Sequence, residues 1–318
     1  MLHASSSLPD IAVLRGGSLN FKASLAEGVD VLSSLKKIGY KPLDVIIAKD
    51  GTWTTGGVPT DAHHIFTRTH TVVDVTHMQG EKYQKLAEEM SVPIIFSRNN
   101  EMITNREDMY RILRMQGVPV PETQVIRSST PVKDSTLCTL WTTFHTPLMV
   151  RPLERNQNIP SKLVTQFGEF DNLVREYHKK GIDVHVLTYK KTPTLSLSVI
   201  PNFRGEELYT PLWVETFNAV QGLPDLSYPM RAHANAPEKK KKEIKDFVTK
   251  VYSATGATVP LSIDIITTKN GYMVVNIESS PSLHKDGRFM QSLATTGIDI
   301  GEYIHSRVQE ELEHELSR

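Results

Sequence analysis

The sequence predicts an α/β domain followed by an α+β region. In the first hundred or so residues, short apolar runs alternate with stretches of helical periodicity, which is typical of βαβ units and a mostly parallel sheet. From Asn105 onward helices and strands follow in no regular alternation, and Lys269-Asn270-Gly271 carries a hairpin signal. We therefore predict a small doubly wound domain at the N-terminus, with a boundary near residue 104.

The predicted N-terminal domain begins with a strand, a glycine turn and a helix. Residues 11–14 form an apolar run that ends in Arg15-Gly16-Gly17-Ser18. The helix that follows is expected to bury one face, because apolar side chains recur at helical spacing. These are Leu25, Val29, Leu32 and Leu35. Apolar runs at 43–48, 72–75 and 92–96, with a helix around 81–90, continue the alternation.

The second part is predicted to start with a helix over 105–116, because Gly117 and then Pro119 cannot continue it. Strands at 123–126, 147–151 and 195–199 and a helix near 169–180 follow. Residues 202–235 show no sustained period, which indicates a long functional loop or a mobile segment. Two more helices have apolar faces, which include Ile244, Val248 and Val251 in one and Ile300, Ile304 and Val308 in the other.

The composition excludes several classes of protein. The chain has 318 residues, with 36 Lys and Arg against 36 Asp and Glu, so it has no general attraction for nucleic acid or an anionic membrane. An anionic ligand must then be bound by a local site. The single Cys138 excludes an intramolecular disulfide framework, and no uncharged run is long enough to span a membrane. We expect a soluble, cytoplasmic protein that binds neither nucleic acid nor a membrane.

Oxygen-bearing side chains interrupt the two apolar strands of the predicted hairpin. If the loop is residues 269–271, Asp264 lies opposite Asn276 with Glu278 beside it on the same face. Two carboxylates and an amide then converge as hard ligands suited to Mg²⁺. A two-residue Asn270-Gly271 loop would instead face Asp264 toward Ile277 and scatter the cluster, which would leave an ordinary hairpin with a polar outer face.

Cations elsewhere in the chain allow two interpretations each. Arg106 opens a helix and Arg151 ends a strand, and each can clamp a phosphate or be an ordinary surface cation. The turn at Gly16-Gly17-Ser18 would let an anion approach a helix N-terminus, although two glycines are a weak signal. The run Lys239-Lys240-Lys241-Lys242 is either a phosphate-binding patch or the solvated face of a helix, and we favour the solvated face.

Several short motifs occur in an order that is informative as a whole. They are residues 11–18 with Ser24-Leu25, residues 50–53, Asn105-Arg106 followed by residues 117–121, residues 147–152, and residues 262–264 leading to 276–281. With these motifs the chain resembles the D-alanine–D-alanine ligases of the ATP-grasp superfamily over nearly its whole length. The resemblance implies an ATP-grasp fold with an N-terminal doubly wound domain.

The resemblance also implies domains, an activity and an assembly. The expected domains are an N-terminal α/β substrate domain at 1–104, a central ATP-grasp subdomain at 105–184, and a C-terminal subdomain with the metal site at 185–318. ATP would lie between the last two. The implied reaction forms an acyl phosphate from one amino acid, which the amine of a second attacks to give a dipeptide of the peptidoglycan-precursor type. Enzymes of this kind are commonly homodimers.

Site residues follow from the same resemblance. Mg²⁺ would be held by Asp264, Asn276 and Glu278, and Arg106 and Arg151 would position the phosphates of ATP. The remaining implied positions are the adenine site at Leu187, Thr188, Tyr189 and Lys190, the amino-acid pocket at Gly17, His77, Ser282 and His284, and catalytic positions at Ser18, Asn20, Arg151 and Lys285.

The chain departs from the family at several of these positions. Arg106 and Arg151 stand where the family has two lysines, residues 153–160 replace a glycine- and serine-rich loop, and Leu187 and Thr194 replace two acids of the nucleotide site. Asn20 stands in place of a glutamate, and Ser262 in place of the arginine that stabilises the transferred phosphoryl group, for which Arg155, Arg204 and Arg231 are candidate substitutes. The alternative hypothesis is a catalytically weakened homologue that binds nucleotide or regulates.

Overall fold

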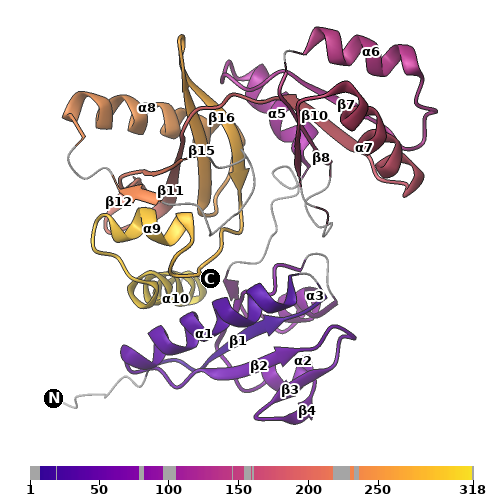
Figure 1. Ribbon diagram of the computed structural model, residues 1–318. Helices are drawn as coiled ribbons and strands as arrows, with labels where there is room; N and C mark the ends of the chain where they lie inside the picture. The colour runs from indigo at the N-terminus through magenta and orange to yellow at the C-terminus, as the bar shows by residue number, and fades with distance from the viewer. Residues whose placement is uncertain are drawn as a thin grey trace, which may run out of the picture. The chain divides into compact units, whose positions relative to one another are not determined.

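The chain divides into two compact units, residues 1–99 together with 280–318, and residues 100–279. The computed structural model describes residues 8–18, 20–78, 82–95, 105–144, 146–153, 159, 161–217, 230–232 and 236–316. The ribbon is coloured along the chain in Figure 1. The division into domains at 1–104, 105–184 and 185–318 stays a prediction.

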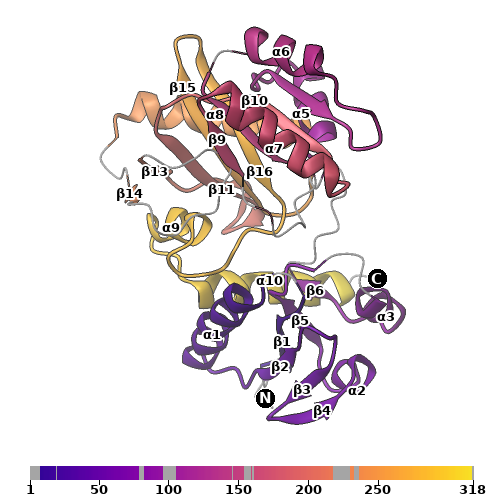
Figure 2. The same cartoon turned by 45° about the vertical axis from the view of Figure 1, so that its right-hand side comes forward.

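In its described part, the first unit is built on one sheet with strand order β4-β3-β2-β1-β5-β6. β1, β2, β5 and β6 are parallel, and β3 and β4 extend the edge in antiparallel fashion. Helix α1 lies on one side of the strands and α2 and α3 on the other (Figure 2), so the predicted doubly wound domain is confirmed. The elements are β1 (Ile11–Gly16), α1 (Phe21–Lys37), β2 (Leu43–Ile47), β3 (Trp53–Thr55), β4 (Val58–Thr60), α2 (Ala62–Phe66), β5 (Thr71–Asp74), α3 (Lys82–Glu89), β6 (Ile94–Ile95), α9 (Arg288–Ala294) and α10 (Ile300–Leu316).

The buried face of α1 differs in part from the predicted one. Val29 is 53% exposed, so its place in the expected apolar stripe is wrong. Leu32 and Leu35 are buried as predicted, and Ser24, Glu27 and Val31 complete the buried face. A glutamate therefore occupies a position where the period of the helix would favour an apolar side chain.

The described residues of the second unit form two antiparallel sheets, and the first has strand order β7-β10-β8-β9. Val150 of β8 and Val186 of β10 pack on one of its faces, in a core shared with Leu137 of α6 and Phe170 of α7. The elements are α5 (Arg106–Met115), β7 (Thr123–Ile126), α6 (Asp134–Thr143), β8 (Leu148–Pro152), β9 (Lys162–Val164), α7 (Phe167–Lys179) and β10 (Val184–Thr188).

The other sheet of this unit has strand order β14-β13-β11-β15-β16, and β12 also pairs with β11. Helix α8 packs on it through Ile244, Val248 and Val251, as predicted. Short strands occur within residues 202–235, so the expected lack of regular structure is wrong in the described part of that stretch. The elements are β11 (Thr194–Phe203), β12 (Glu206–Tyr209), β13 (Val214–Thr216), β14 (Met230–Ala232), α8 (Glu238–Thr255), β15 (Leu261–Thr268) and β16 (Gly271–Glu278).

In the hairpin of β15 and β16, Asp264 and Asn276 pair as predicted, but the turn and the register that produce this pairing differ from the prediction. Thr268 pairs with Gly271, so the turn has only two residues, and neither predicted loop is correct. A β-bulge then leaves Val275 without a partner on β15, and this extra residue brings Asp264 opposite Asn276. The pairing that gathers the carboxylates on one face is therefore confirmed.

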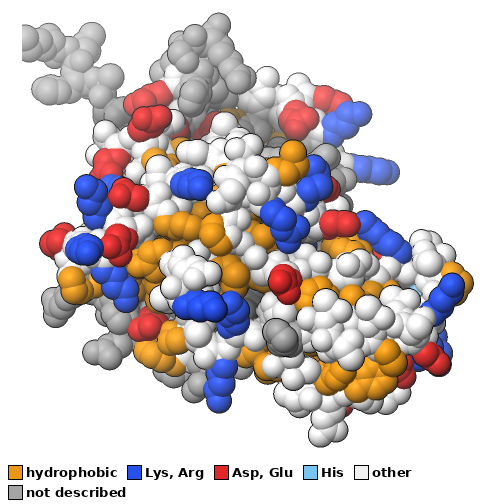
Figure 3. Space-filling model, turned by 90° about the horizontal axis from the view of Figure 1, so that it is seen from above, with side chains coloured by type: hydrophobic (Ala, Val, Ile, Leu, Met, Phe, Trp, Pro, Cys, Tyr) orange, Lys and Arg blue, Asp and Glu red, His pale blue; other side chains and the backbone are white. Residues whose placement is uncertain are grey.

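The described surface carries charges of both signs. Lys and Arg side chains are interspersed with Asp and Glu side chains over the face shown in Figure 3. Among the described residues, no helix combines the length and the apolar character needed to cross a membrane.

Candidate functional site

Arg151 is a fully buried cation on the first sheet of the second unit. Its neighbour Val150 points into the core with α6 and α7, and because side chains alternate along a strand, Arg151 lies on the opposite face. Its Nε donates to Nδ1 of His185, its cross-strand partner on β10, over 3.3 Å. Its Nη2 donates to the hydroxyl of Tyr110 over 3.1 Å. In the part of the chain that the structure describes, Nη1 has no hydrogen-bond partner.

The surroundings of this guanidinium suit an anion. A buried charge is costly unless an opposite charge and hydrogen bonds compensate it. The two hydrogen-bond partners of Arg151 among the described residues are an imidazole nitrogen and a hydroxyl. Neither carries a negative charge, so they orient the positive charge without neutralising it. A phosphate oxygen at Nη1 would supply the missing acceptor and the missing charge.

Tyr110 connects Arg151 to the hairpin. The tyrosine is on α5 and is 1% exposed, and its hydroxyl donates to the carbonyl of Val275 over 2.6 Å. Val275 is the bulged residue of β16 and directly precedes Asn276. One tyrosine therefore fixes both the cation and the strand that carries the predicted metal ligands.

The predicted metal ligands form a hydrogen-bonded cluster. The amide Nδ2 of Asn276 donates to Asp264 over 3.3 Å and to Glu278 over 3.1 Å. Ser196 of β11 donates to the other oxygen of Asp264 over 2.5 Å. Asp264 and Asn276 are 3% and 2% exposed. The structure thus brings together all three residues predicted to hold Mg²⁺.

The donor set of this cluster fits a hard divalent cation. The Oδ1 atom of Asn276 is buried and has no hydrogen-bond partner among the described residues. Because both amide hydrogens are committed to the carboxylates, this oxygen is held as a free acceptor. Two carboxylates and one amide oxygen match the ligand preference of Mg²⁺. The cluster has only two carboxylates, and nowhere in the described ranges does a group of three or more His, Cys, Asp or Glu side chains occur that could hold a metal.

Arg106 contacts the backbone beside Arg151. It is the first residue of α5, and the side chain of Asn105 caps this helix by accepting from the amides of Glu107 and Asp108. Its Nη1 donates to the carbonyls of Pro152 and Leu153 over 2.8 and 3.2 Å. Arg106 thereby holds the chain that directly follows Arg151. Its expected role on phosphate stays a prediction, as does that of the replaced loop, because residues 154–158 and 160 lie outside the described residues.

The segment expected to meet adenine offers an apolar surface. Leu187 and Tyr189 pack with Met149, on the face of the sheet that carries Arg151. The amides of Thr188 and Tyr189 already donate to backbone carbonyls. Lys190 is exposed. Adenine recognition here stays a prediction, with the apolar surface as its structural basis.

The glycine turn of the first unit is held tightly. The amide of Gly17 donates to the carbonyl of Ile47 over 2.6 Å, and a Cβ on Gly17 would lie 2.7 Å from the sulfur of Met78. The amide and hydroxyl of Ser18 contact the same sulfur over 3.4 and 3.6 Å. Asn20 adopts a left-handed conformation directly before α1. Gly17 and Ser18 thus both lie against the sulfur of Met78. The roles predicted for Gly17, Ser18 and Asn20 stay predictions.

Glu27 joins two predicted substrate positions, and the sequence analysis did not single it out. His77 Nε2 lies 2.8 Å from one carboxylate oxygen, which also accepts from the hydroxyl of Ser282 over 2.9 Å. The amide of Leu283 donates to the other oxygen over 2.6 Å. Glu27 is 2% exposed. The signal that could have revealed it is its position on the helical face of Ser24, where a charge needs partners.

The remaining predicted substrate positions lie beside α1. His284 Nε2 is 3.7 Å from the carboxylate of Asp30, and the amide of Lys285 donates to the same carboxylate over 3.2 Å. Asp30 is one helical turn beyond Glu27, so the segment 282–285 follows two acids of α1. The structure therefore brings His77, Ser282, His284 and Lys285 to one helix.

A second buried acid ends β5. Asp74 accepts from the amide and hydroxyl of Thr76 over 2.9 and 2.7 Å and from the hydroxyl of Tyr83 over 2.7 Å. Burial raises the pKa of Asp74 above its ordinary value, and the hydrogen bonds from Thr76 and Tyr83 and the charge of His77 oppose that rise. With all three hydrogen bonds made inside the unit, Asp74 fixes the loop that leads to His77.

No protein-family model matches the chain. The D-alanine–D-alanine ligases of Francisella philomiragia subsp. philomiragia and Francisella tularensis subsp. novicida are 22% and 21% identical to it over 169 residues. Each match covers 52% of this chain and 55% of the relative, so the chain spans about half the length of the curated relatives it matches.

Solved structures match nearly the whole chain. The VanG D-Ala:D-Ser ligase from Enterococcus faecalis has a TM-score of 0.76 at 13% identity, over 96% of this chain and 100% of that one. The D-alanyl-alanine synthetase A from Vibrio cholerae has a TM-score of 0.76 at 16% identity, over 96% and 99%. The D-alanine–D-alanine ligase from Bacillus anthracis in complex with ATP has a TM-score of 0.72 at 15% identity, over 96% and 98%. The ATP-grasp fold implied by the resemblance is confirmed.

Proposed function

We propose that this chain is an ATP- and Mg²⁺-dependent carboxylate–amine ligase of the D-alanine–D-alanine ligase type. The observation that carries the proposal is that one buried cation and one buried oxygen acceptor of the second unit each lack a hydrogen-bond partner among the described residues. Nη1 of Arg151 and Oδ1 of Asn276 have no hydrogen-bond partner in its described part, and Tyr110 connects the two through Val275. A nucleotide phosphate with its metal ion supplies the missing partner of each.

Arg151 acts in this proposal as an oriented charge. His185 and Tyr110 fix the guanidinium without cancelling its charge, which then acts in full on a phosphate. Phosphoryl transfer needs positioning and charge stabilisation more than covalent help from protein. The missing arginine at Ser262 leaves Arg151 as the buried cation best placed to meet this need.

The hairpin acts as the metal-binding element. Asp264 and Glu278 would hold Mg²⁺ together with Asn276, whose amide hydrogens orient its oxygen by binding both carboxylates. When bound, the ion supplies neutralisation of phosphate charge. Ser196 keeps Asp264 in place by donating to the oxygen that Asn276 does not contact.

The first unit supplies the amino-acid contacts in this proposal. The comparison proteins include ligases named for D-Ala–D-Ala and D-Ala:D-Ser, which supports two amino acids as substrates. Gly17, Ser18 and Asn20 at the turn and His77, Ser282, His284 and Lys285 beside α1 would contact them. The acyl-phosphate intermediate, the peptidoglycan-precursor product, the homodimer and the cytoplasmic location rest on the resemblance alone and are proposed on that basis.

Thermal unfolding with Mg-ATP provides the first test. A ligand present at 100 times its dissociation constant stabilises the folded state by about 2.7 kcal/mol, which corresponds to roughly 5–10 °C in melting temperature for a unit of this size. We expect such a shift at millimolar Mg-ATP. Absence of a shift at that concentration contradicts nucleotide binding and with it both the ligase and the nucleotide-binding module.

Turnover separates the ligase from the module. We expect ADP release when D-alanine, or D-alanine with D-serine, is added to protein and Mg-ATP. Binding without ADP release for a panel of D- and L-amino acids supports the weakened homologue instead. Asp264→Ala is expected to abolish release and the Mg²⁺ dependence of the melting shift, whereas Asp246→Ala, an exposed acid of the same unit, is expected to retain both. Full turnover by Asp264→Ala refutes the metal site.

A further inference from the structure

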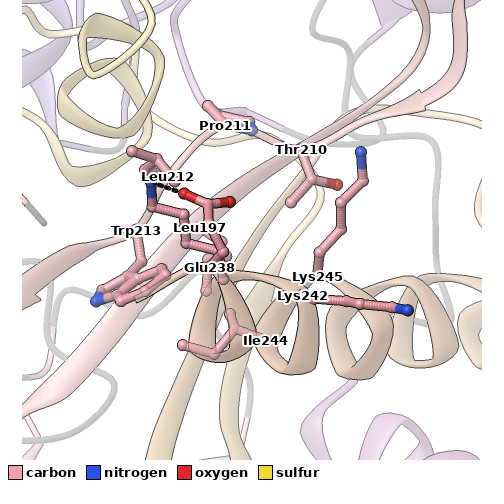
Figure 4. Close-up of a pocket in the computed structure, with 10 residues that line it drawn as sticks. Leu197, Thr210, Pro211, Leu212, Trp213, Glu238, Lys242, Ile244 and Lys245 are labelled. Carbon is pink, nitrogen blue, oxygen red and sulfur yellow. Dashed lines mark hydrogen bonds and ion pairs between the residues drawn. The ribbon is translucent and has the colours of Figure 1, made fainter. Parts of the chain in front are cut away.

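A pocket of about 260 Å³ lies between helix α8 and the segment that connects β12 to β13. The residues that matter to its chemistry are Leu197, Thr210, Trp213, Lys241, Lys242 and Lys245. They belong to three separate elements, β11, the connecting segment and α8. Figure 4 shows the helix along one side of the pocket and Thr210 and Pro211 across from it.

This pocket is on the opposite face of the sheet from the proposed metal site. Ser196 of β11 points to Asp264, and the next residue, Leu197, must point the other way because side chains alternate. Leu197 accordingly packs in the core that contains Ile244 and Val248 of α8. The sheet itself therefore separates the pocket from the carboxylates, and a ligand in one does not occupy the other.

One face of α8 brings positive charge to the pocket. Glu238, Lys241, Lys242 and Lys245 are spaced by three and four residues, so they lie on the same side of the helix. Lys241 pairs with Glu238 over 2.7 Å, and Lys245 pairs with Glu206 over 3.1 Å. Lys242 makes no ion pair with any residue that the structure describes. Glu238 also lines the pocket, but its carboxylate is paired with Lys241, so Lys242 is the pocket lysine whose charge no described carboxylate neutralises.

Among the described residues, the pocket walls other than the lysine face of α8 are apolar except for the hydroxyl of Thr210. Trp213 is 1% exposed, and Leu197 and Ile244 are 2% and 1% exposed. The Oγ1 atom of Thr210 is buried and has no hydrogen-bond partner within the described ranges. Thr210 lies on the same side of the pocket as Lys242 and Lys245, with Trp213 on the other side (Figure 4). A buried hydroxyl without a partner costs free energy, which a ligand oxygen would recover.

We propose that this pocket binds a small organic anion, with its phosphate or carboxylate at Lys242 and Thr210 and its apolar body against Leu197, Ile244 and Trp213. Thr210 donates its hydroxyl hydrogen to the anion. The volume is below the range of about 300–1,000 Å³ typical of sites for drug-sized ligands, which favours a compact molecule over a nucleotide or a peptide. The site is independent of the proposed ligase activity, because the sheet separates it from the proposed metal site.

Calorimetric titration of the full chain with phenyl phosphate tests the proposal, since this probe combines a dianion with a compact ring. We expect saturable binding with one site per chain. Inorganic phosphate and phenol, each of which has only one half of the probe, are expected to bind at least tenfold more weakly. Benzoate distinguishes the two anion types, and binding of benzoate alone assigns the site to carboxylates.

Two variants with matched controls locate the bound probe. Lys242→Gln is expected to weaken binding about fivefold, whereas Lys239→Gln, which removes the same charge from the same helix outside the pocket, is expected to change it less than twofold. Thr210→Val is expected to weaken binding about threefold to tenfold and to leave the melting temperature of the free protein unchanged or higher, because it removes a hydroxyl that has no partner.

Three results would overturn the proposal. Absence of saturable binding to phenyl phosphate and benzoate removes the site. Equal losses in Lys239→Gln and Lys242→Gln show diffuse attraction to a basic helix. If Arg151→Met loses binding of the probe and Lys242→Gln keeps it, the probe occupies the proposed nucleotide site. That result refutes the anion pocket and leaves the ligase proposal intact.

Discussion

Replacing Arg151 by methionine is expected to stabilise the ligand-free protein and to abolish its response to nucleotide. Methionine is close to arginine in length, so it fills the same space on the face of β8 without a charge. The two effects have opposite signs because, in the proposed function, the buried guanidinium binds a phosphate of the nucleotide, whereas in the free protein its burial costs free energy. His185 and Tyr110 accept from it, but neither carries the negative charge that would compensate its burial.

The magnitude follows from the contacts of the side chain. The two hydrogen bonds to neutral acceptors contribute about 1 kcal/mol each. The guanidinium also lies over the ring of Tyr110, 5.9 Å from its centre, a contact that contributes about 0.5–2 kcal/mol, and the variant loses all three. The unpartnered Nη1 costs about 1–3 kcal/mol, and removing the charge from water costs several kcal/mol more. The expected net gain in the free energy of unfolding is about 1–3 kcal/mol. At about 2–4 °C per kcal/mol for a unit of this size, the melting temperature should rise by roughly 2–12 °C.

Scanning calorimetry with and without Mg-ATP measures both effects in one protein. Arg151→Lys is the matched control, since it keeps the charge and should show no gain in stability and part of the nucleotide shift. A loss of more than about 1 kcal/mol in Arg151→Met would show that the contacts with His185 and Tyr110 outweigh the cost of burial. An undiminished Mg-ATP shift in Arg151→Met would show that nucleotide binds elsewhere.

Three further predictions concern stability. Burial acts to raise the pKa of Asp183, but hydrogen bonds from Ser128 and a neighbouring arginine hold it below the ordinary value of 3.8, so their stabilisation is present above that pH and is lost as pH falls below it. Asp183→Asn should accordingly lower the melting temperature at pH 7 and make no difference near pH 2, and an equal loss at both pH values contradicts the assignment. Glu27→Gln should lower the free energy of unfolding in urea by about 1–3 kcal/mol, because an amide group cannot accept all three hydrogen bonds, and an unchanged midpoint would show that they are dispensable. Gly16→Ala should cost about 2–4 kcal/mol, because φ is +96° and the new Cβ would lie 2.3 Å from a carbonyl oxygen of β2, whereas Gly57→Ala, with φ of +80° and open space, should lose only the smaller cost of the backbone conformation.

The fold was predictable wherever one periodicity extended over a whole element. The alternation of apolar runs and helical stretches predicted the parallel core of the first sheet, and the face of Ile244, Val248 and Val251 predicted how α8 packs. Short strands carried too few residues for a period to be recognised. After the end of β11, the described strands within 202–235 are each only three or four residues long, which explains why they were missed.

The site was predictable where chemistry depended on residue type, and less so where it depended on local geometry. Asp264 and Asn276 were paired correctly, but a two-residue turn and a bulge replaced the expected loop, because nothing in the residue types marks Val275 as bulged. Glu27 was missed because its buried position became evident only from the true face of α1. Arg151 was recognised as a cation, whereas its burial between Tyr110 and His185 depends on contacts distant in sequence.

The bulge at Val275 constrains how this hairpin can change length during evolution. Asp264 and Asn276 share a face because one extra residue in β16 offsets the short turn at 269–270. Adding a single residue to the turn would move every distal side chain of β16 to the other face unless the bulge were lost at the same time. In homologous hairpins, the number of residues between the acid and the amide should therefore stay odd or stay even. A residue gained in the turn can be offset by the loss of the bulged residue, and the reverse.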